Sequence, residues 1–98
     1  MSITREVRES GSTVIHVDGQ FDFSVVRDFR EAYQDLGGKE ITIDLRNTDY
    51  LDSAALGMLL NMQSYLEKPD GTIRIVNAMP QIKRVLVIAR FEKKFLIE

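Results

Sequence analysis

The stretch Tyr50-Leu51-Asp52-Ser53-Ala54-Ala55-Leu56-Gly57-Met58-Leu59-Leu60 places an aspartate and a serine directly before a long apolar run. Such residues typically begin a helix, because their side chains accept hydrogen bonds from its first free N–H groups. The alternating segment Ile41-Thr42-Ile43-Asp44-Leu45 precedes it and predicts a strand that leads through a polar turn into the helix. A hydroxyl in the first turn is expected to be displayed rather than buried.

Outward from this unit, the chain alternates between short β-branched segments and helical apolar spacing. Residues 18–24 are expected to form a loop that ends in a helix cap at Ser24, and Gly37-Gly38 to stop the helix that follows. The third helix is expected to begin at Pro80 and to bury Ile82, Val85, Leu86 and Ala89. The expected elements are strands at 3–8, 13–17, 41–45, 72–76 and 95–97, and helices at 25–36, 53–66 and from 80.

This order, β-β-α-β-α-β-α(-β), predicts a single α/β domain over residues 1–98. Its sheet is expected to be mixed but mostly parallel, with four to five strands, and to carry three to four helices. The chain has no cysteine, which excludes disulfides and Cys-based metal sites. The start has no signal-peptide pattern and no apolar run is long enough to span a bilayer, so we expect a soluble cytoplasmic protein without membrane contact.

A formal net charge of −2 with interspersed signs argues against nucleic-acid binding. One basic cluster interrupts this pattern, and we interpret it as a solvated helix end whose cations complement the helix dipole. Its members are Lys83, Arg84, Arg90, Lys93 and Lys94.

Enzyme signatures are missing from the sequence. No glycine-rich phosphate loop occurs, and the one histidine, His16, lies inside a predicted strand, so we expect no enzyme and no cofactor. Four loop aspartates could hold a divalent metal, although acidic residues between strands and helices are more often caps and turns. They are Asp18, Asp22, Asp49 and Asp52.

Ser53 is open to several interpretations. It could cap the helix, with Asp52 as the alternative cap, or be an ordinary polar residue of the first turn, or be a buried small residue that packs Gly57 against the sheet. The stripe expected to face the sheet consists of Ala55, Leu59, Met62 and Leu66. Three further apolar side chains then lie off the stripe and form either a docking patch or a surface covered by a neighbouring helix. They are Leu56, Met58 and Leu60.

At these residues the chain resembles the STAS domain family, in particular single-domain anti-sigma factor antagonists of the SpoIIAA type, and most closely the HsbA-type subgroup. The family motif is a strand ending in Asp-Leu, a short turn, and then Asp-Ser-Ser-Gly-Leu-Gly opening a helix. The corresponding segment here is Asp44-Leu45-Arg46-Asn47-Thr48-Asp49-Tyr50-Leu51-Asp52-Ser53-Ala54-Ala55-Leu56-Gly57, and a second family element matches Gly19-Gln20-Phe21-Asp22. Ala54 replaces the second serine of the family, so Ser53 is the only hydroxyl at this position.

The resemblance implies that Ser53 is phosphorylated by a serine kinase of the anti-sigma type and dephosphorylated by a PP2C-type phosphatase. It implies that the unphosphorylated protein sequesters an anti-sigma factor or another negative regulator and releases it when phosphorylated. The expected partner-binding residues are Phe21, Asp22, Asp52, Ser53, Leu56, Met58 and Leu60. Two alternatives remain: an accessory STAS subunit of a transport or regulatory complex, and a small-ligand or nucleotide-binding module.

Overall fold

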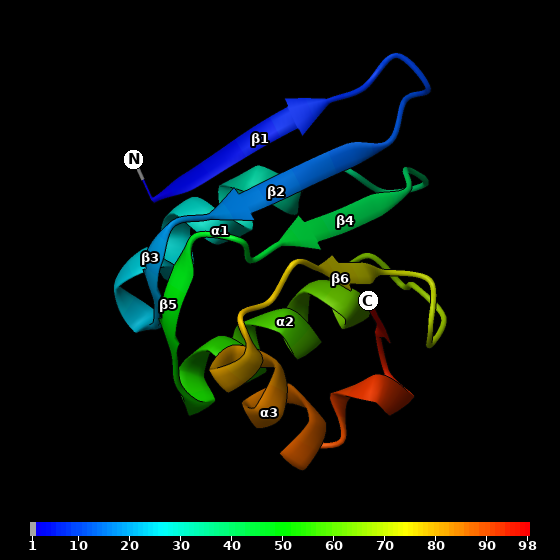
Figure 1. The fold of residues 1–98 in the computed structure, drawn as a ribbon. Helices are drawn as coiled ribbons and strands as arrows, with labels where there is room; N and C mark the ends of the chain where they lie inside the picture. Colours follow the sequence, from blue (N-terminus) through cyan, green and yellow to red (C-terminus); the bar gives the residue numbers. More distant parts are fainter. Residues whose placement is uncertain (1) are drawn as a thin grey trace.

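The computed structural model describes residues 2–98 and contains a five-stranded mixed sheet (Figure 1). Strands β1 and β2 form an antiparallel hairpin, and the remaining neighbours in the sheet run parallel, as the sequence predicts. The strand order is β1-β2-β4-β6-β7. These strands are β1 (Ile3–Val7), β2 (Thr13–Val17), β4 (Ile41–Asp44), β6 (Arg74–Val76) and β7 (Leu96–Ile97).

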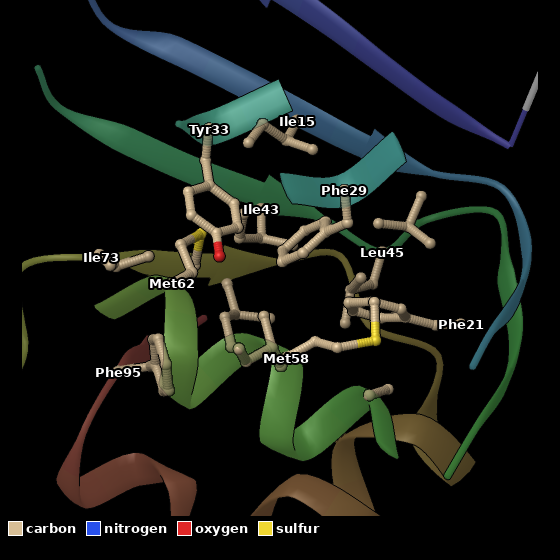
Figure 2. Packing of buried hydrophobic residues seen from close by; sticks show 14 of the residues in the cluster. Ile15, Phe21, Phe29, Tyr33, Ile43, Leu45, Met58, Met62, Ile73 and Phe95 are labelled. Carbon is tan, nitrogen blue, oxygen red and sulfur yellow. The ribbon is translucent and has the colours of Figure 1, made fainter. Parts of the chain in front are cut away.

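Three α-helices and two single-turn helices connect the strands, which confirms the α/β fold class. Figure 2 shows aromatic residues of α1 and methionines of α2 facing the same side of the sheet, where they form the core. The helices are η1 (Phe23–Val25), α1 (Val26–Tyr33), α2 (Ser53–Tyr65), α3 (Pro80–Ile88) and η2 (Phe91–Lys93).

The alternation of the strands explains why the helices cover one face of the sheet. Ile15, Ile43 and Ile75 are register partners on three adjacent strands, and each is fully buried. The residues next along β2 and β4, His16 and Asp44, point to the opposite face and are only partly buried. Successive strand residues point to opposite faces, so the period-2 pattern of the sequence directly selects the core face.

A second, two-stranded sheet was not expected from the sequence. Strand β3 (Gly19–Phe21) lies within the predicted loop, and β5 (Thr48–Leu51) lies within the predicted polar turn; they pair in parallel. The Thr48 hydroxyl donates a hydrogen bond to the Val17 carbonyl oxygen at 2.6 Å and is fully buried. Both strands are too short for a period-2 pattern, and each is formed by pairing with a distant part of the chain.

Two details of the predicted helices are corrected. Asp22, and not Ser24, caps the first helical turn, and that turn is the 3₁₀ helix η1, so α1 begins only at Val26. The predicted buried stripe of the third helix wrongly includes Ala89, because α3 ends at Ile88 and Ala89 is exposed. A helix that stops there cannot present Ala89 on its buried face.

Candidate functional site

The parallel pairing of β3 and β5 brings two aspartates to the same end of the small sheet. Phe21 is the register partner of Leu51, so Asp22 and Asp52 follow directly where the two strands end. Residues that leave adjacent parallel strands at the same register lie near one another. The pairing therefore joins the two sequence motifs, which are thirty positions apart, into one surface.

Both aspartates are helix caps. The Asp22 carboxylate accepts a hydrogen bond from the Ser24 backbone N–H at 2.9 Å, and the Asp52 carboxylate accepts one from Ala55 N–H at 3.1 Å. Each bond satisfies an N–H group at a helix start that has no partner within the helix. The two carboxylates are thus held in place by the backbone.

Because Asp52 is the cap of α2, Ser53 is the first residue of the helix, and it is exposed. Its hydroxyl takes part in none of the hydrogen bonds found among residues 2–98. The interpretations of Ser53 as the cap and as a buried packing residue are therefore wrong, and the displayed first-turn hydroxyl is confirmed. Gly57 is not pressed against the sheet, since a Cβ atom built on it would meet no atom within 4 Å.

Two residues expected at the partner-binding surface belong to the core instead. Phe21 is fully buried and Met58 is 6% exposed, and the two side chains point toward one another between α2 and the small sheet (Figure 2). Met58 lies about 200° around the helix from Leu56 and so faces the opposite way. Leu56 is half-buried, and Leu60 is 38% exposed. The predicted patch therefore keeps Leu56 and Leu60 and loses Met58.

The structure adds two aromatic side chains that sequence reasoning missed. Phe23, directly after the Asp22 cap, is 70% exposed, and Tyr50 on β5 is 48% exposed. Tyr50 is the register partner of Gln20, which is also exposed, so the outward face of the small sheet continues the surface around the caps. The spacing of Phe21 and Phe23 suggests that both side chains lie on the same face of one strand. The chain instead begins η1 at Phe23, and the Phe23 side chain is exposed.

The surface around Ser53 combines these apolar side chains with negative charge. Asp49 is exposed on β5, and none of the ion pairs among residues 2–98 involves Asp22, Asp49 or Asp52. The N-terminus of α2 adds partial positive charge from its free N–H groups. We call the surface formed by Asp22, Phe23, Tyr50, Asp52, Ser53, Leu56 and Leu60 the Ser53 surface.

The four loop aspartates are not gathered into one cluster of ligands in the described part of the chain. Within residues 2–98, no group of three His, Cys, Asp or Glu side chains is arranged to hold a metal ion. Asp22 and Asp52 use their carboxylates as helix caps instead, which is the alternative the sequence also allowed. None of the helices in this part of the chain has the length and apolar character needed to cross a membrane.

Comparison with known proteins gives the family of this chain. A family model with the description "Mlab, STAS domain" matches residues 4–98, and the chain belongs to the STAS domain family. It is 37% identical over 100 residues to the STAS-domain containing protein PA14_20770 of Pseudomonas aeruginosa (strain UCBPP-PA14), covering 99% of each chain.

Solved structures share this fold at low sequence identity. The anti-sigma factor antagonist SpoIIAA in its unphosphorylated form superposes with a TM-score of 0.78 at 19% identity, over 98% of this chain and 87% of that chain. The Bacillus cell fate determinant SpoIIAA in the phosphorylated form gives a TM-score of 0.69 at 19% identity, over 98% of this chain and 90% of that chain. The same fold is therefore present in the three structures.

Proposed function

We propose that this STAS domain is an anti-sigma factor antagonist whose binding is controlled by phosphorylation of Ser53. Without phosphate, the Ser53 surface binds an anti-sigma factor, or a serine kinase of that type, and so keeps a negative regulator from its target. The observation that carries the proposal is the exposed Ser53 hydroxyl at the first position of α2, beside exposed apolar side chains. The solved SpoIIAA structures, one of them phosphorylated, support it by their shared fold.

The position of Ser53 suits a switch that needs no refolding. A phosphate adds a charge of about −1.5 to −2. The N-terminus of α2 tolerates that charge, because its dipole and free N–H groups favour anions. The neighbouring carboxylates of Asp22 and Asp52 repel the phosphate. A partner that contacts Phe23 and Tyr50 would also have to remove water from the phosphate, and this weakens its binding.

The required energy is large but attainable. Moving a partner from almost fully bound to almost fully free takes about 5.5 kcal/mol of differential affinity. A dianion left unpaired in a closed interface carries a desolvation penalty of several kcal/mol. A single modification can therefore supply a large part of the switch, and a PP2C-type phosphatase would reverse it.

The chain's own chemistry favours a regulatory role over a catalytic one. A nucleophilic serine needs an adjacent base. His16 instead lies on the open face of the large sheet, with Nε2 at 3.0 Å from a Glu6 carboxylate oxygen and Nδ1 at 3.5 Å from one of Asp44. In the proposed function ATP is bound by the kinase, so this domain needs no cofactor. A regulator of sigma factor availability acts in the cytoplasm.

The test compares Ser53→Ala and Ser53→Asp in pull-downs from native lysate, with phosphosite mapping of the wild-type protein. We expect Ser53→Ala to retain the regulator, Ser53→Asp to lose it, and phosphate to be found on Ser53. Ser64 is exposed on the same helix, so Ser64→Ala and Ser64→Asp are matched controls that should both retain the partner.

Other outcomes would contradict the switch. If both Ser53 variants hold the same partner and Ser53 is never modified, the interface is permanent and the domain is an accessory subunit. If ATP or GTP with magnesium raises the melting temperature of the wild-type protein but not that of Asp52→Ala, the surface is a nucleotide site.

A further inference from the structure

Helix α3 carries apolar side chains on both of its faces. Ile82 and Leu86 are 3% and 0% exposed and attach the helix to the domain. On the outward side, Val87 is 47% exposed and Ile88 is 74% exposed. The solvent face of such a helix is normally polar. Ile88 is the most exposed large apolar side chain in the described part of the chain, and nothing within residues 2–98 covers it.

These side chains border a shallow hollow of about 380 Å³. Its walls are Pro80, Lys83, Arg84, Val87 and Ile88, which follow one another at three- and four-residue spacing along the outward side of α3. The hollow is large enough to receive an apolar side chain of another molecule, and its rim carries two cations.

The charge of this face is not explained by the helix dipole. The sequence predicts that the basic cluster is a helix end, but Lys83 and Arg84 are the fourth and fifth of the nine residues of α3, and the last turn contains no basic residue. The helix dipole acts on charges in the first and last turns, so it does not stabilise cations in the middle of the helix. None of the ion pairs among residues 2–98 involves Lys83 or Arg84, and α3 itself has no acidic residue. Arg90 and Lys93 directly beyond the helix add further positive charge.

We propose that the outward face of α3 binds an acidic amphipathic segment of a partner protein. A leucine-like side chain of the segment would enter the hollow between Val87 and Ile88, and its carboxylates would pair with Lys83 and Arg84. Positive charge around an apolar centre is complementary to such a segment. The helix exposes two large apolar side chains on this face, Val87 and Ile88, which are too few to anchor on lipid alone.

This face is a different surface from the one around Ser53 and has the opposite charge. The Ser53 surface carries two aspartates, Asp22 and Asp52, whereas the α3 face carries only cations. The α3 face would therefore hold an acidic partner whether or not Ser53 is phosphorylated. Its small area implies a weak interaction, which suits a second anchor in a larger complex.

The test uses the full chain and a fluorescein-labelled amphipathic peptide, EELLEELLEE, in an anisotropy titration. We expect saturable binding that weakens about tenfold or more in the double variant Lys83→Glu, Arg84→Glu and in Ile88→Ser, a loss of roughly 1.4 kcal/mol for each tenfold change. Matched controls are Val7→Ser, at an apolar side chain that is 63% exposed on β1, and Arg27→Glu, at an exposed cation on α1; both should bind as the wild type does. Circular dichroism checks that each variant is folded.

Several results would overturn the proposal. One is no saturable binding; another is equal binding of the charge-reversed peptide KKLLKKLLKK. Binding that Ser53→Asp weakens and Ile88→Ser does not would place the peptide on the Ser53 surface. Adsorption to phosphatidylcholine–phosphatidylglycerol vesicles that Ile88→Ser abolishes, without peptide binding, would assign the face to membrane. A wild-type dimer in sedimentation that Ile88→Ser dissociates would assign it to a second copy.

Discussion

At the scale of single residues, Asp52 and Ser53 have different roles at the start of α2. Asp52 caps α2 through its bond to Ala55 N–H, and this leaves the Ser53 hydroxyl free at the surface. If Ser53 were the cap, its hydroxyl would be engaged by the backbone and less accessible to a kinase. The aspartate before the serine is therefore part of the reason why the serine is displayed.

The cap makes a stability prediction. Asp52→Ala should lower the free energy of unfolding by about 1 kcal/mol, because the Ala55 N–H at the start of α2 loses its acceptor. Urea unfolding followed by circular dichroism measures the change. Asp52→Asn should retain most of the stability, since its amide oxygen can accept the same bond. Asp49→Ala, at an exposed position on β5, is the control and should stay within about 0.5 kcal/mol of the wild type. Equal losses in the two alanine variants would exclude the cap as the cause.

At the scale of elements, the small sheet and α2 position the Ser53 surface. Strand β3 exists only because β5 pairs with it, and its first residue, Gly19, has φ of +84°. Helix α2 follows β5 directly and runs for thirteen residues, with Ala55, Leu59 and Met62 buried as the sequence predicts. The strand pairing sets where Asp22 lies, and the helix sets where Ser53 lies.

Two glycines in these elements should respond in opposite directions to alanine. A Cβ atom on either would meet open space, so neither change causes a clash. Gly19→Ala should destabilise by about 1–2 kcal/mol, because it forces a left-handed backbone on an L-residue. Gly57→Ala, inside α2, should stabilise by about 0.5–1 kcal/mol through improved helix propensity. Thermal or urea unfolding of the two variants measures these changes in stability. A change of the same sign in both variants would contradict the prediction.

At the scale of the whole molecule, a line of aromatic rings connects the small sheet to the far end of the helical layer. Phe21 lies against Phe29 with ring centroids 5.1 Å apart, Phe29 against Tyr33 at 5.4 Å, and Tyr33 against Tyr65 at 5.8 Å. Edge and tilted contacts at these distances stabilise beyond simple burial. The line ties α1 to α2, so the position of the Ser53 surface depends on the packing of the entire core.

Tyr33 in that line should lower the stability of the fold at alkaline pH. Burial raises the pKa of the Tyr33 phenol above its ordinary value of 10.0, the nearby Tyr65 adds to this, and the positive charge and hydrogen bond of Arg30 oppose it. A raised pKa means that the folded state favours the protonated phenol. This contribution to stability is complete below the unfolded-state pKa of about 10 and is lost as pH rises through the folded-state value.

Tyr33→Phe should therefore flatten the fall in stability between neutral pH and about pH 11, because the variant has no phenol to ionise at this position. Urea midpoints measured across that range test the prediction. Tyr50→Phe, at an exposed ring, is the control and should follow the wild-type pH profile. A profile of Tyr33→Phe that is as steep as that of the wild type would assign the alkaline loss to other groups.

The sequence by itself determined the elements whose pattern is local. The alternation in residues 13–17 and 41–45 predicted two strands, and the apolar spacing of α2 predicted the helix and its buried stripe. Backbone geometry places residues at these periods on one face of the element, and that face is buried. The Asp52-Ser53 pair likewise predicted the helix start and the displayed hydroxyl. These features depend on neighbours within a few residues.

Only the tertiary structure decided what depends on distant contacts. The pairing of β3 with β5 gathers Asp22 beside Asp52, buries Phe21 and Met58, and exposes Phe23 and Tyr50. A three-residue strand has no period to recognise, and whether an off-stripe side chain is covered depends on which other element packs beside it. The sequence therefore determined that the Ser53 hydroxyl is displayed at the start of a helix, and the tertiary structure decided which side chains surround it.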